Sequence, residues 1–436
     1  MPIDSRYKKV LVVGEGAEKP RVQSGGCDHT NLLWNTDLLA ELKEELKSSE
    51  INYEKGYLLD GQNDEQLALS AVEKAKDSDV VIFMLSLPES YESEGYDREN
   101  ILLPENQVEL LEKLCAVHEK VVVVMQNGAP VDMCRVNYAK AILETYLLGG
   151  ITGRATAQIL SGKANPSGKL AESFPLKIED TPCYLSFPGF NDKVVYSEGL
   201  FVGYRYYSSK NIQVAYPFGH GLSYTKFKLD GVKLSSNEFI PNGEIVLSFD
   251  IENTGDFDGA EVVQVYIGNL SFGKTRPIKE LKKFVRCDLK KGEKKTYQIV
   301  LNNEDFAHYS EIENDFVVNN GKYKLYLGCS SEDIKASLEV QATGFVEVVK
   351  YDNHTRIGEI LKTSKGQKVV EEKLLGYIYM AMFGNFNTDI KLGDDITKES
   401  FFVNVMNSMP LQALCNFSSG AFDDEKLEEV LHLLND

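Results

Sequence analysis

Several patterns are missing from this sequence. Its seven cysteines include no CxxC pair and no Cys/His spacing typical of a metal site, which disfavours a zinc-binding fold and a disulfide framework. No segment approaches the roughly 18 apolar residues that cross a bilayer, and residues 1–9 lack the apolar stretch of a secretory signal. We therefore expect a cytoplasmic protein whose cysteines are reduced and mostly buried.

Basic charge is also scarce. The chain has 47 basic and 66 acidic residues, a net charge of −19, and no basic stripe. This balance disfavours nucleic acid and anionic membranes as partners, because both repel an acidic surface. The 43% apolar and 10% aromatic content is typical of a folded globular protein, and 436 residues suffice for two or three domains.

The N-terminal half alternates strand and helix patterns. Strands are predicted at residues 9–13, 80–87, 120–125 and 141–146, and helices at residues 37–46, 64–76, 104–118 and 153–160. This alternation predicts an α/β fold with a mostly parallel sheet covered by helices on both faces. Gly14 and Gly16 resemble the start of a dinucleotide fingerprint, but Lys19 replaces its third glycine and Pro20 follows. A nucleotide-binding protein is therefore disfavoured.

The pattern changes near residue 226. Apolar and polar residues alternate over 245–251, and residues 262–267 and 322–327 form further short strand patterns, which predicts an immunoglobulin-like β-sandwich. Helix patterns return at residues 373–382, 398–405 and 423–434. The expected domains are an α/β sandwich at 1–225, a β-sandwich at 226–345 and a short helical tail at 346–436.

An acidic loop follows the apolar run at 80–87. Glu89, Glu92 and Glu94 lie within six positions, and Gly95 permits a sharp turn. Ligand sites of open α/β sheets lie where such strands emerge. Crowded carboxylates raise one another's pKa, as a general acid near neutral pH requires. The alternative is a solvated acidic surface loop.

Five motifs, taken in order, resemble one family. They are Glu92-Ser-Glu94-Gly-Tyr-Asp97-Arg98 with Leu103-Pro-Glu-Asn-Gln107, Asn127-Gly-Ala-Pro130, Asn165-Pro-Ser-Gly-Lys-Leu-Ala-Glu-Ser-Phe-Pro175, Tyr196 to Tyr207, and Tyr216-Pro-Phe-Gly-His-Gly-Leu-Ser-Tyr-Thr225. They are similar to the C-terminal half of glycoside hydrolase family 3, in particular its bacterial β-glucosidases. The resemblance extends from about Lys8 to the end of the chain.

The resemblance implies an α/β sandwich followed by a fibronectin type III-like domain. It maps the family's acid/base glutamate onto Glu94, with Glu92 as the alternative, and makes Asp97 and Arg98 supporting residues, the arginine pairing with a carboxylate. Family members usually carry a preceding (β/α)8 barrel, which supplies the aspartate nucleophile and most sugar contacts. We expect that this chain lacks the barrel and needs it as a partner in cis or in trans. The implied substrate is a β-glucoside or oligosaccharide, and no cofactor is implied.

The expected chemistry needs that partner. Retaining glycosidases use two carboxylates about 5–5.5 Å apart, a nucleophile and an acid/base. The chain alone is therefore expected to be inactive, as one half of a split or truncated β-glucosidase. An exposed apolar face for the barrel would support this hypothesis. The alternative is a non-catalytic carbohydrate-binding or scaffold protein, for which saturable sugar binding would be the sign.

Three further residues are candidates for a functional site. Trp34, the only tryptophan, fits a core or staple position better than a sugar-stacking platform, although substrate binding stays open. Glu198 is a second candidate acid in a motif rich in aromatic residues. His220 is expected to be packed and hydrogen-bonded rather than catalytic.

Overall fold

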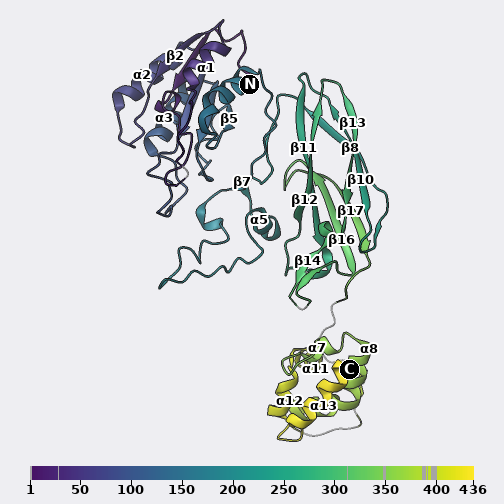
Figure 1. Cartoon of the computed structure of the whole chain (residues 1–436). Coiled ribbons are helices and arrows are strands. Elements are labelled where there is room, and N and C mark those ends of the chain that lie inside the picture. Colours follow the sequence, from purple (N-terminus) through teal and green to yellow (C-terminus); the bar gives the residue numbers. More distant parts are fainter. Residues whose placement is uncertain are drawn as a thin grey trace. The chain divides into compact units, whose positions relative to one another are not determined.

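The computed structural model describes residues 2–27, 29–311, 313–346, 350–384, 389, 391–393 and 400–436. The chain forms two compact units, residues 1–345 and residues 346–436. Figure 1 shows the elements of each unit.

The first unit begins with a five-stranded parallel sheet. Its strands are β1 (Lys9–Val13), β2 (Glu50–Glu54), β3 (Val80–Ser86), β4 (Val121–Gln126) and β5 (Ala141–Glu144). They lie in the order β2-β1-β3-β4-β5, and every neighbouring pair is parallel. The expected parallel α/β sheet is confirmed.

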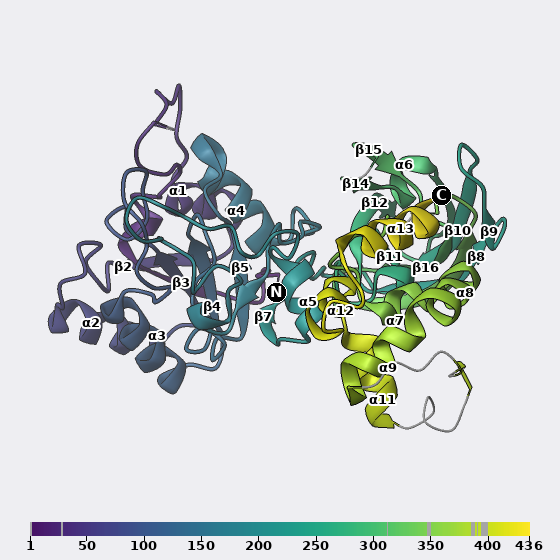
Figure 2. The same ribbon diagram turned by 90° about the horizontal axis from the view of Figure 1, so that it is seen from below.

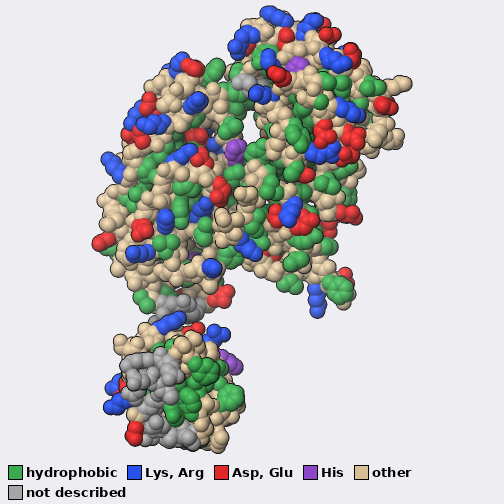
Figure 3. Space-filling model, turned by 180° about the vertical axis from the view of Figure 1, so that it is seen from behind, with side chains coloured by type: hydrophobic (Ala, Val, Ile, Leu, Met, Phe, Trp, Pro, Cys, Tyr) green, Lys and Arg blue, Asp and Glu red, His purple; other side chains and the backbone are tan. Residues whose placement is uncertain are grey.

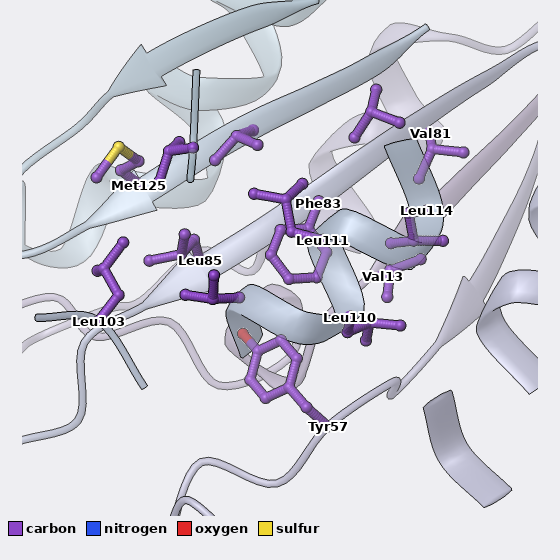
Figure 4. Packing of buried hydrophobic residues seen from close by; sticks show 14 of the residues in the cluster. Val13, Tyr57, Val81, Phe83, Leu85, Leu103, Leu110, Leu111, Leu114 and Met125 are labelled. Carbon is purple, nitrogen blue, oxygen red and sulfur yellow. The ribbon is translucent and has the colours of Figure 1, made fainter. Parts of the chain in front are cut away.

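Helices cover both faces of this sheet (Figure 2). Helices α1 (Leu38–Glu45) and α4 (Thr152–Ser161) pack on one face, and α2 (Glu65–Lys76) and α3 (Glu105–Val117) pack on the other. Alternate residues of β3 enter the two cores: Ile82 faces α1 and α4, whereas Phe83 packs among Leu110, Leu111 and Leu114 of α3 (Figure 4). A strand buried on both faces is apolar along most of its length, which explains the apolar run at residues 80–85.

Four elements of this part differ from the sequence-based prediction. Strand β2 was not predicted, because its edge position leaves it half-buried and its sequence, Glu-Ile-Asn-Tyr-Glu, carries no apolar run. Between residues 161 and 225, where no element was predicted, the structure has the short helix α5 (Tyr204–Lys210) and a small antiparallel pair of β6 (Phe174–Pro175) with β7 (Val214–Tyr216). Gly203 and Asn211 bound α5 at positive φ and interrupt any longer period.

The second part of this unit is a β-sandwich. One sheet has the order β13-β10-β8 and the other β12-β11-β16-β17-β9. Their bounds are β8 (Phe227–Leu234), β9 (Glu238–Phe239), β10 (Ile245–Asn253), β11 (Gly259–Asn269), β12 (Glu280–Leu289), β13 (Lys294–Leu301), β16 (Gly321–Gly328) and β17 (Ile334–Ala342). The short helix α6 (Asn303–Phe306) and the hairpin of β14 (His308–Ser310) with β15 (Asp315–Val317) interrupt the strands. The predicted sandwich is confirmed, whereas the division of residues 1–345 at residue 225 stays a prediction.

The unit at 346–436 is helical and has its own apolar core. Its helices are α7 (Ile357–Ile360), α8 (Ser364–Val369), a π-helical turn (Val370–Leu374), α9 (Leu375–Phe383), α11 (Ser400–Ser408), α12 (Leu411–Phe417) and α13 (Asp424–Asn435). The helix predicted at 398–405 is present from Ser400, and its first two residues lie outside the described residues.

Three further properties of the structure concern hydropathy, surface charge and the cysteines. No helix in the described part of the chain is long and apolar enough to span a membrane. On the face drawn in Figure 3, basic and acidic side chains of the described residues are interspersed. The cysteines are free, but Cys27 and Cys134 are exposed and only Cys287 is fully buried. The prediction of mostly buried thiols is therefore wrong.

Candidate functional site

The strand order brings two loops together at the carboxyl edge of the sheet. Strand β1 lies between β2 and β3, so the connections after β1 and β3 leave the sheet next to each other. This is the point where the strand order reverses, the usual place for a ligand crevice in open α/β sheets. The loop after β1 carries Arg21 and Cys27, and the loop after β3 carries Glu92 and Glu94.

Residues from three loops, those after β1, β3 and β4, hold the Glu92 side chain in place. Its side chain is buried, with 7% of its surface exposed. Arg21 Nη1 donates to Glu92 Oε1 at 2.7 Å, and Arg21 Nη2 donates to the Glu92 carbonyl at 2.9 Å. The Gly128 amide after β4 donates to the same Oε1, and Arg98 Nη1 lies 3.6 Å from Oε2. These contacts occupy both carboxylate oxygens with structural partners.

Glu94, two residues further on, is exposed. Its Oε2 accepts a hydrogen bond from the Cys27 backbone amide at 2.6 Å, and its own amide lies 3.5 Å from the Gly25 carbonyl. The close approach needs a glycine at position 26, because a Cβ there would lie 2.4 Å from Glu94 Oε2, and Gly26 has a φ of +89°. The loop after β1 therefore orients a carboxylate that points toward solvent.

The pKa of Glu94 does not follow the expectation from crowding. The backbone amide and the side chain of Cys27 both hydrogen-bond the Glu94 carboxylate. Because these bonds favour the ionised form, they lower the pKa of Glu94 below its ordinary value. Burial acts in the opposite direction and is outweighed by these hydrogen bonds. In this chain Glu94 is therefore poised as an anion.

The two predicted supporting residues differ in their surroundings. Arg98 is largely buried, donates to the Pro130 carbonyl at 3.1 Å and faces Glu92, in agreement with a guanidinium that holds the loop. Asp97 is exposed, and its side chain makes no hydrogen bond or ion pair within the described part of the chain. A supporting role for Asp97 stays a prediction.

Two further carboxylates lie near Glu92, and sequence reasoning missed both. Glu144 ends β5, its Oε1 accepts from the Tyr146 amide at 2.7 Å, and burial raises its pKa to about 8. Burial also raises the pKa of Glu172, on which the charges of Glu92 and Arg98 act. Their signal in the sequence was weak: Glu144 ends a predicted strand and Glu172 lies within a family motif, but neither position indicates proximity to Glu92 without the sheet order.

The other candidates have different surroundings. Trp34 lies in the loop before α1 with 59% of its surface exposed, so the core interpretation is wrong and sugar binding stays a prediction. Glu198 lines a separate cavity of about 330 Å3 beside α5. His220 packs its ring against Tyr216 with centroids 5.2 Å apart, and burial lowers its pKa, as expected for a packed residue.

Comparison with protein families assigns both parts of the first unit. Residues 1–224 match the glycosyl hydrolase family 3 C-terminal domain, and residues 261–331 match the fibronectin type III-like domain. The first match covers the parallel sheet and the loops that carry Glu92 and Glu94.

Curated relatives extend the similarity to the whole chain. Thermostable beta-glucosidase B of Acetivibrio thermocellus is 36% identical over 430 residues, which are 98% of this chain and 56% of that protein. Exo-alpha-(1->6)-L-arabinopyranosidase of Bifidobacterium longum is 38% identical over 409 residues, 93% of this chain and 52% of that protein. The chain thus spans about half the length of the relatives it matches.

A solved structure shows the same relationship. The GH3 beta-glucosidase of Bifidobacterium adolescentis superposes with a TM-score of 0.77 at 38% identity, over 85% of this chain and 54% of the other. Together these matches cover the sheet, the loops at its carboxyl edge and the β-sandwich.

Proposed function

This chain belongs to glycoside hydrolase family 3, and from that premise we propose that it supplies the acid/base half of a retaining β-glucosidase, with Glu94 as the acid/base. The observation that carries the proposal is the contrast between two neighbouring glutamates. Both oxygens of Glu92 have structural partners, whereas Glu94 is exposed beside the point where the strand order reverses. Only Glu94 can reach a substrate without breaking the contacts that hold its loop.

The chemistry divides between this chain and a partner. In the first step Glu94 gives its proton to the glycosidic oxygen as the bond from that oxygen to the anomeric carbon breaks. In the second step the Glu94 carboxylate takes a proton from the attacking water, and the sugar is released. The nucleophile that holds the sugar between these steps would come from a (β/α)8 barrel outside this chain.

The partner also bears on the protonation of Glu94. As the chain stands, hydrogen bonds from Cys27 lower the pKa of Glu94. A docked domain and a bound sugar would remove water from the carboxylate, and desolvation raises the pKa of a carboxyl group. Proton donation is therefore expected of the assembled site and not of this chain alone.

An apolar segment supports the need for a partner. Residues 182–203, which we call the apolar arm, extend beside α5 as an irregular segment (Figure 1). Phe190 and Lys193 exchange backbone hydrogen bonds of 3.0 and 3.1 Å around a turn at Asn191 and Asp192, so the tip has a defined conformation. Its exposed large apolar side chains are Tyr184, Leu185, Phe187, Phe190, Val194, Val195, Tyr196, Leu200 and Val202.

Such a concentration of apolar surface marks an interaction site. The relatives are about twice as long as the matched part, so a further domain is available in those proteins to cover the apolar arm. We assign the barrel of the family to this surface.

The test replaces the matched 430 residues of the Acetivibrio thermocellus relative with this chain. We expect the chimera to hydrolyse an aryl β-glucoside and this chain alone to be inactive. Because a general acid/base contributes about 10²–10⁴-fold, Glu94→Gln should lower kcat/KM by about that factor. The matched control is Glu89→Gln, which changes an exposed carboxylate of the same loop and should leave the rate unchanged.

Three other results would contradict parts of the proposal. Full activity of Glu94→Gln would overturn the assignment of the acid/base. A chimera that folds but does not hydrolyse the aryl β-glucoside would favour the alternative of a non-catalytic binding or scaffold protein. Preference for an aryl α-L-arabinopyranoside, the kind of sugar named for the Bifidobacterium longum relative, would overturn the β-glucoside specificity.

A further inference from the structure

The cavity of about 330 Å3 beside α5 lies between the α/β part and the β-sandwich of the first unit. Its walls come from three segments: the apolar arm, α5 and the chain that connects β11 to β12. The volume falls at the lower end of the range for small-molecule sites. The lining residues that could contact a ligand there include Glu198, Phe201, Tyr206, Lys210, Lys274 and Arg276.

Hydrogen bonds hold the walls of this cavity against each other. The Ile278 amide donates to Ser209 Oγ at 3.2 Å, which joins the connection before β12 to α5 across the cavity. The Leu281 amide donates to the Tyr204 hydroxyl at 2.7 Å and adds a second bond between the same segments. The cavity is therefore formed before any ligand binds, which lowers the entropic cost of binding.

The charge around the cavity is opposite to that of the whole chain. Three basic side chains, Lys210, Lys274 and Arg276, face the single carboxylate of Glu198, which leaves a net charge of +2 in a chain of net charge −19. Lys274 forms no hydrogen bond or ion pair within the described residues. Lys210 Nζ lies 5.4 Å from the centroid of the Tyr206 ring and has no acidic partner there. Unpaired cations gathered at a cavity favour an anionic ligand.

Glu198 adds a requirement of a different kind. Its Oε2 is buried and has no hydrogen-bond partner among the described residues, although buried polar atoms are nearly always paired. The Phe201 amide donates to the Glu198 carbonyl at 2.9 Å, so the backbone turn that carries this side chain is fixed. An ionised carboxylate can only accept, and its missing partner is therefore a donor. The basic neighbours disfavour an ammonium group, whereas a hydroxyl group meets the requirement.

We propose that this cavity binds a monosaccharide that carries a carboxylate or a phosphate group. The anionic group would pair with Lys274 and Arg276, a ring hydroxyl would donate to Glu198 Oε2, and the C–H face of the sugar would pack on Phe201. An inorganic anion would leave Glu198 Oε2 unpaired, and a neutral sugar would leave the basic side chains unused. The cavity shares no residue with the loops that carry Glu92 and Glu94, so the proposal does not depend on the role of Glu94.

The test is calorimetric titration of the full chain with four probes: glucuronate, glucose 6-phosphate, glucose and inorganic phosphate. We expect at least one of the two anionic sugars to bind with a Kd at least about tenfold below those of glucose and inorganic phosphate, because only such a sugar satisfies both requirements. Comparison of glucuronate with glucose 6-phosphate then shows whether the cavity selects the carboxylate or the phosphate.

Three variants locate the binding. Lys274→Met should weaken binding of the anionic sugar by at least about tenfold, because a charge-assisted bond is lost. Glu198→Met should weaken it by a similar factor but should not weaken the binding of inorganic phosphate, since the substitution removes a repulsive charge. Lys193→Met is the control, because Lys193 is an exposed lysine of the apolar arm that does not line the cavity. The unfolding midpoint checks each variant, and Lys274→Met decides the question if Glu198→Met does not fold.

Several results would overturn the inference. Equal affinities for glucuronate, glucose 6-phosphate and glucose would remove the role of the basic side chains, and equal affinities for glucose 6-phosphate and inorganic phosphate would reduce the cavity to a simple anion site. Absence of saturable binding by both anionic sugars would exclude the site altogether. None of these results would change the assignment of Glu94. Conversely, a chimera whose activity survives Glu94→Gln would overturn the acid/base proposal without changing the affinity of the cavity.

Discussion

Two adjacent carboxylates in one loop have opposite environments. Glu92 is buried between Arg21 and Arg98, and Glu94 is exposed and held only by the neighbouring loop. A buried ion pair adds little net stability, but removing one partner leaves an uncompensated charge and costs much more. The contacts of Glu92 thus define where Glu94 can be, even though Glu92 itself cannot reach a substrate.

We predict that Glu92→Gln lowers the free energy of unfolding by about 3 kcal/mol, because Arg21 and Arg98 lose their compensating charge. Urea denaturation at pH 7 measures this change. The control Glu99→Gln, at an exposed position of the same loop, should change stability by less than about 0.5 kcal/mol. Equal stability of the two variants would show that the ion pairs around Glu92 do not hold the loop.

The packing of helices on the sheet sets the position of the loop after β1. Helix α4 approaches the start of α1 at Gly153, where a Cβ would lie 2.4 Å from the Thr36 carbonyl oxygen and 2.6 Å from the Asp37 carbonyl carbon. Asp37 caps α1 and ends the loop that bears Arg21 and Cys27. The close contact between these helices therefore anchors one end of the candidate site.

We predict that Gly153→Ala lowers the free energy of unfolding by about 1–2 kcal/mol, although alanine favours helices. The methyl group would meet backbone atoms, which cannot rotate away. Gly168→Ala is the matched control, since a Cβ there has no atom within 4 Å, and it should be neutral. A stabilised Gly153→Ala variant would mean that α1 and α4 separate easily.

At the scale of the whole molecule, the apolar arm is the surface that we propose contacts a partner domain. Leu185 and Phe190 leave 96% and 80% of their surfaces exposed, so they add almost nothing to the core of this chain. Their substitution should change association and not folding.

We predict that the double variant Leu185→Ser with Phe190→Ser keeps the unfolding midpoint of the free chain but weakens binding to a separately expressed family 3 barrel by at least about tenfold. Binding is measured by calorimetry. Phe284→Ser, which alters an exposed phenylalanine of β12, is the control and should bind like wild type. Unchanged binding by the arm variant would remove the apolar arm from the interface.

Local patterns in the sequence predicted most of the architecture. Continuous apolar runs predicted β3 and β4 because both faces of those strands are buried, and helix periods predicted α2, α3 and α4 nearly to the residue. The edge strand β2 was not predicted, because a half-buried strand lacks a continuous apolar run in its sequence. Motif order identified the family, because each motif keeps its residues together along the chain.

Contacts between distant segments were decided only by the tertiary structure. Arg21 and Glu92 are 71 positions apart, and Gly128 and Glu144 join them only because β1, β3, β4 and β5 are neighbours in the sheet. Burial and charge at such a meeting point depend on all of these segments at once. For this reason the sequence left Glu92 and Glu94 as alternatives, while the fold separated a buried structural carboxylate from an exposed one.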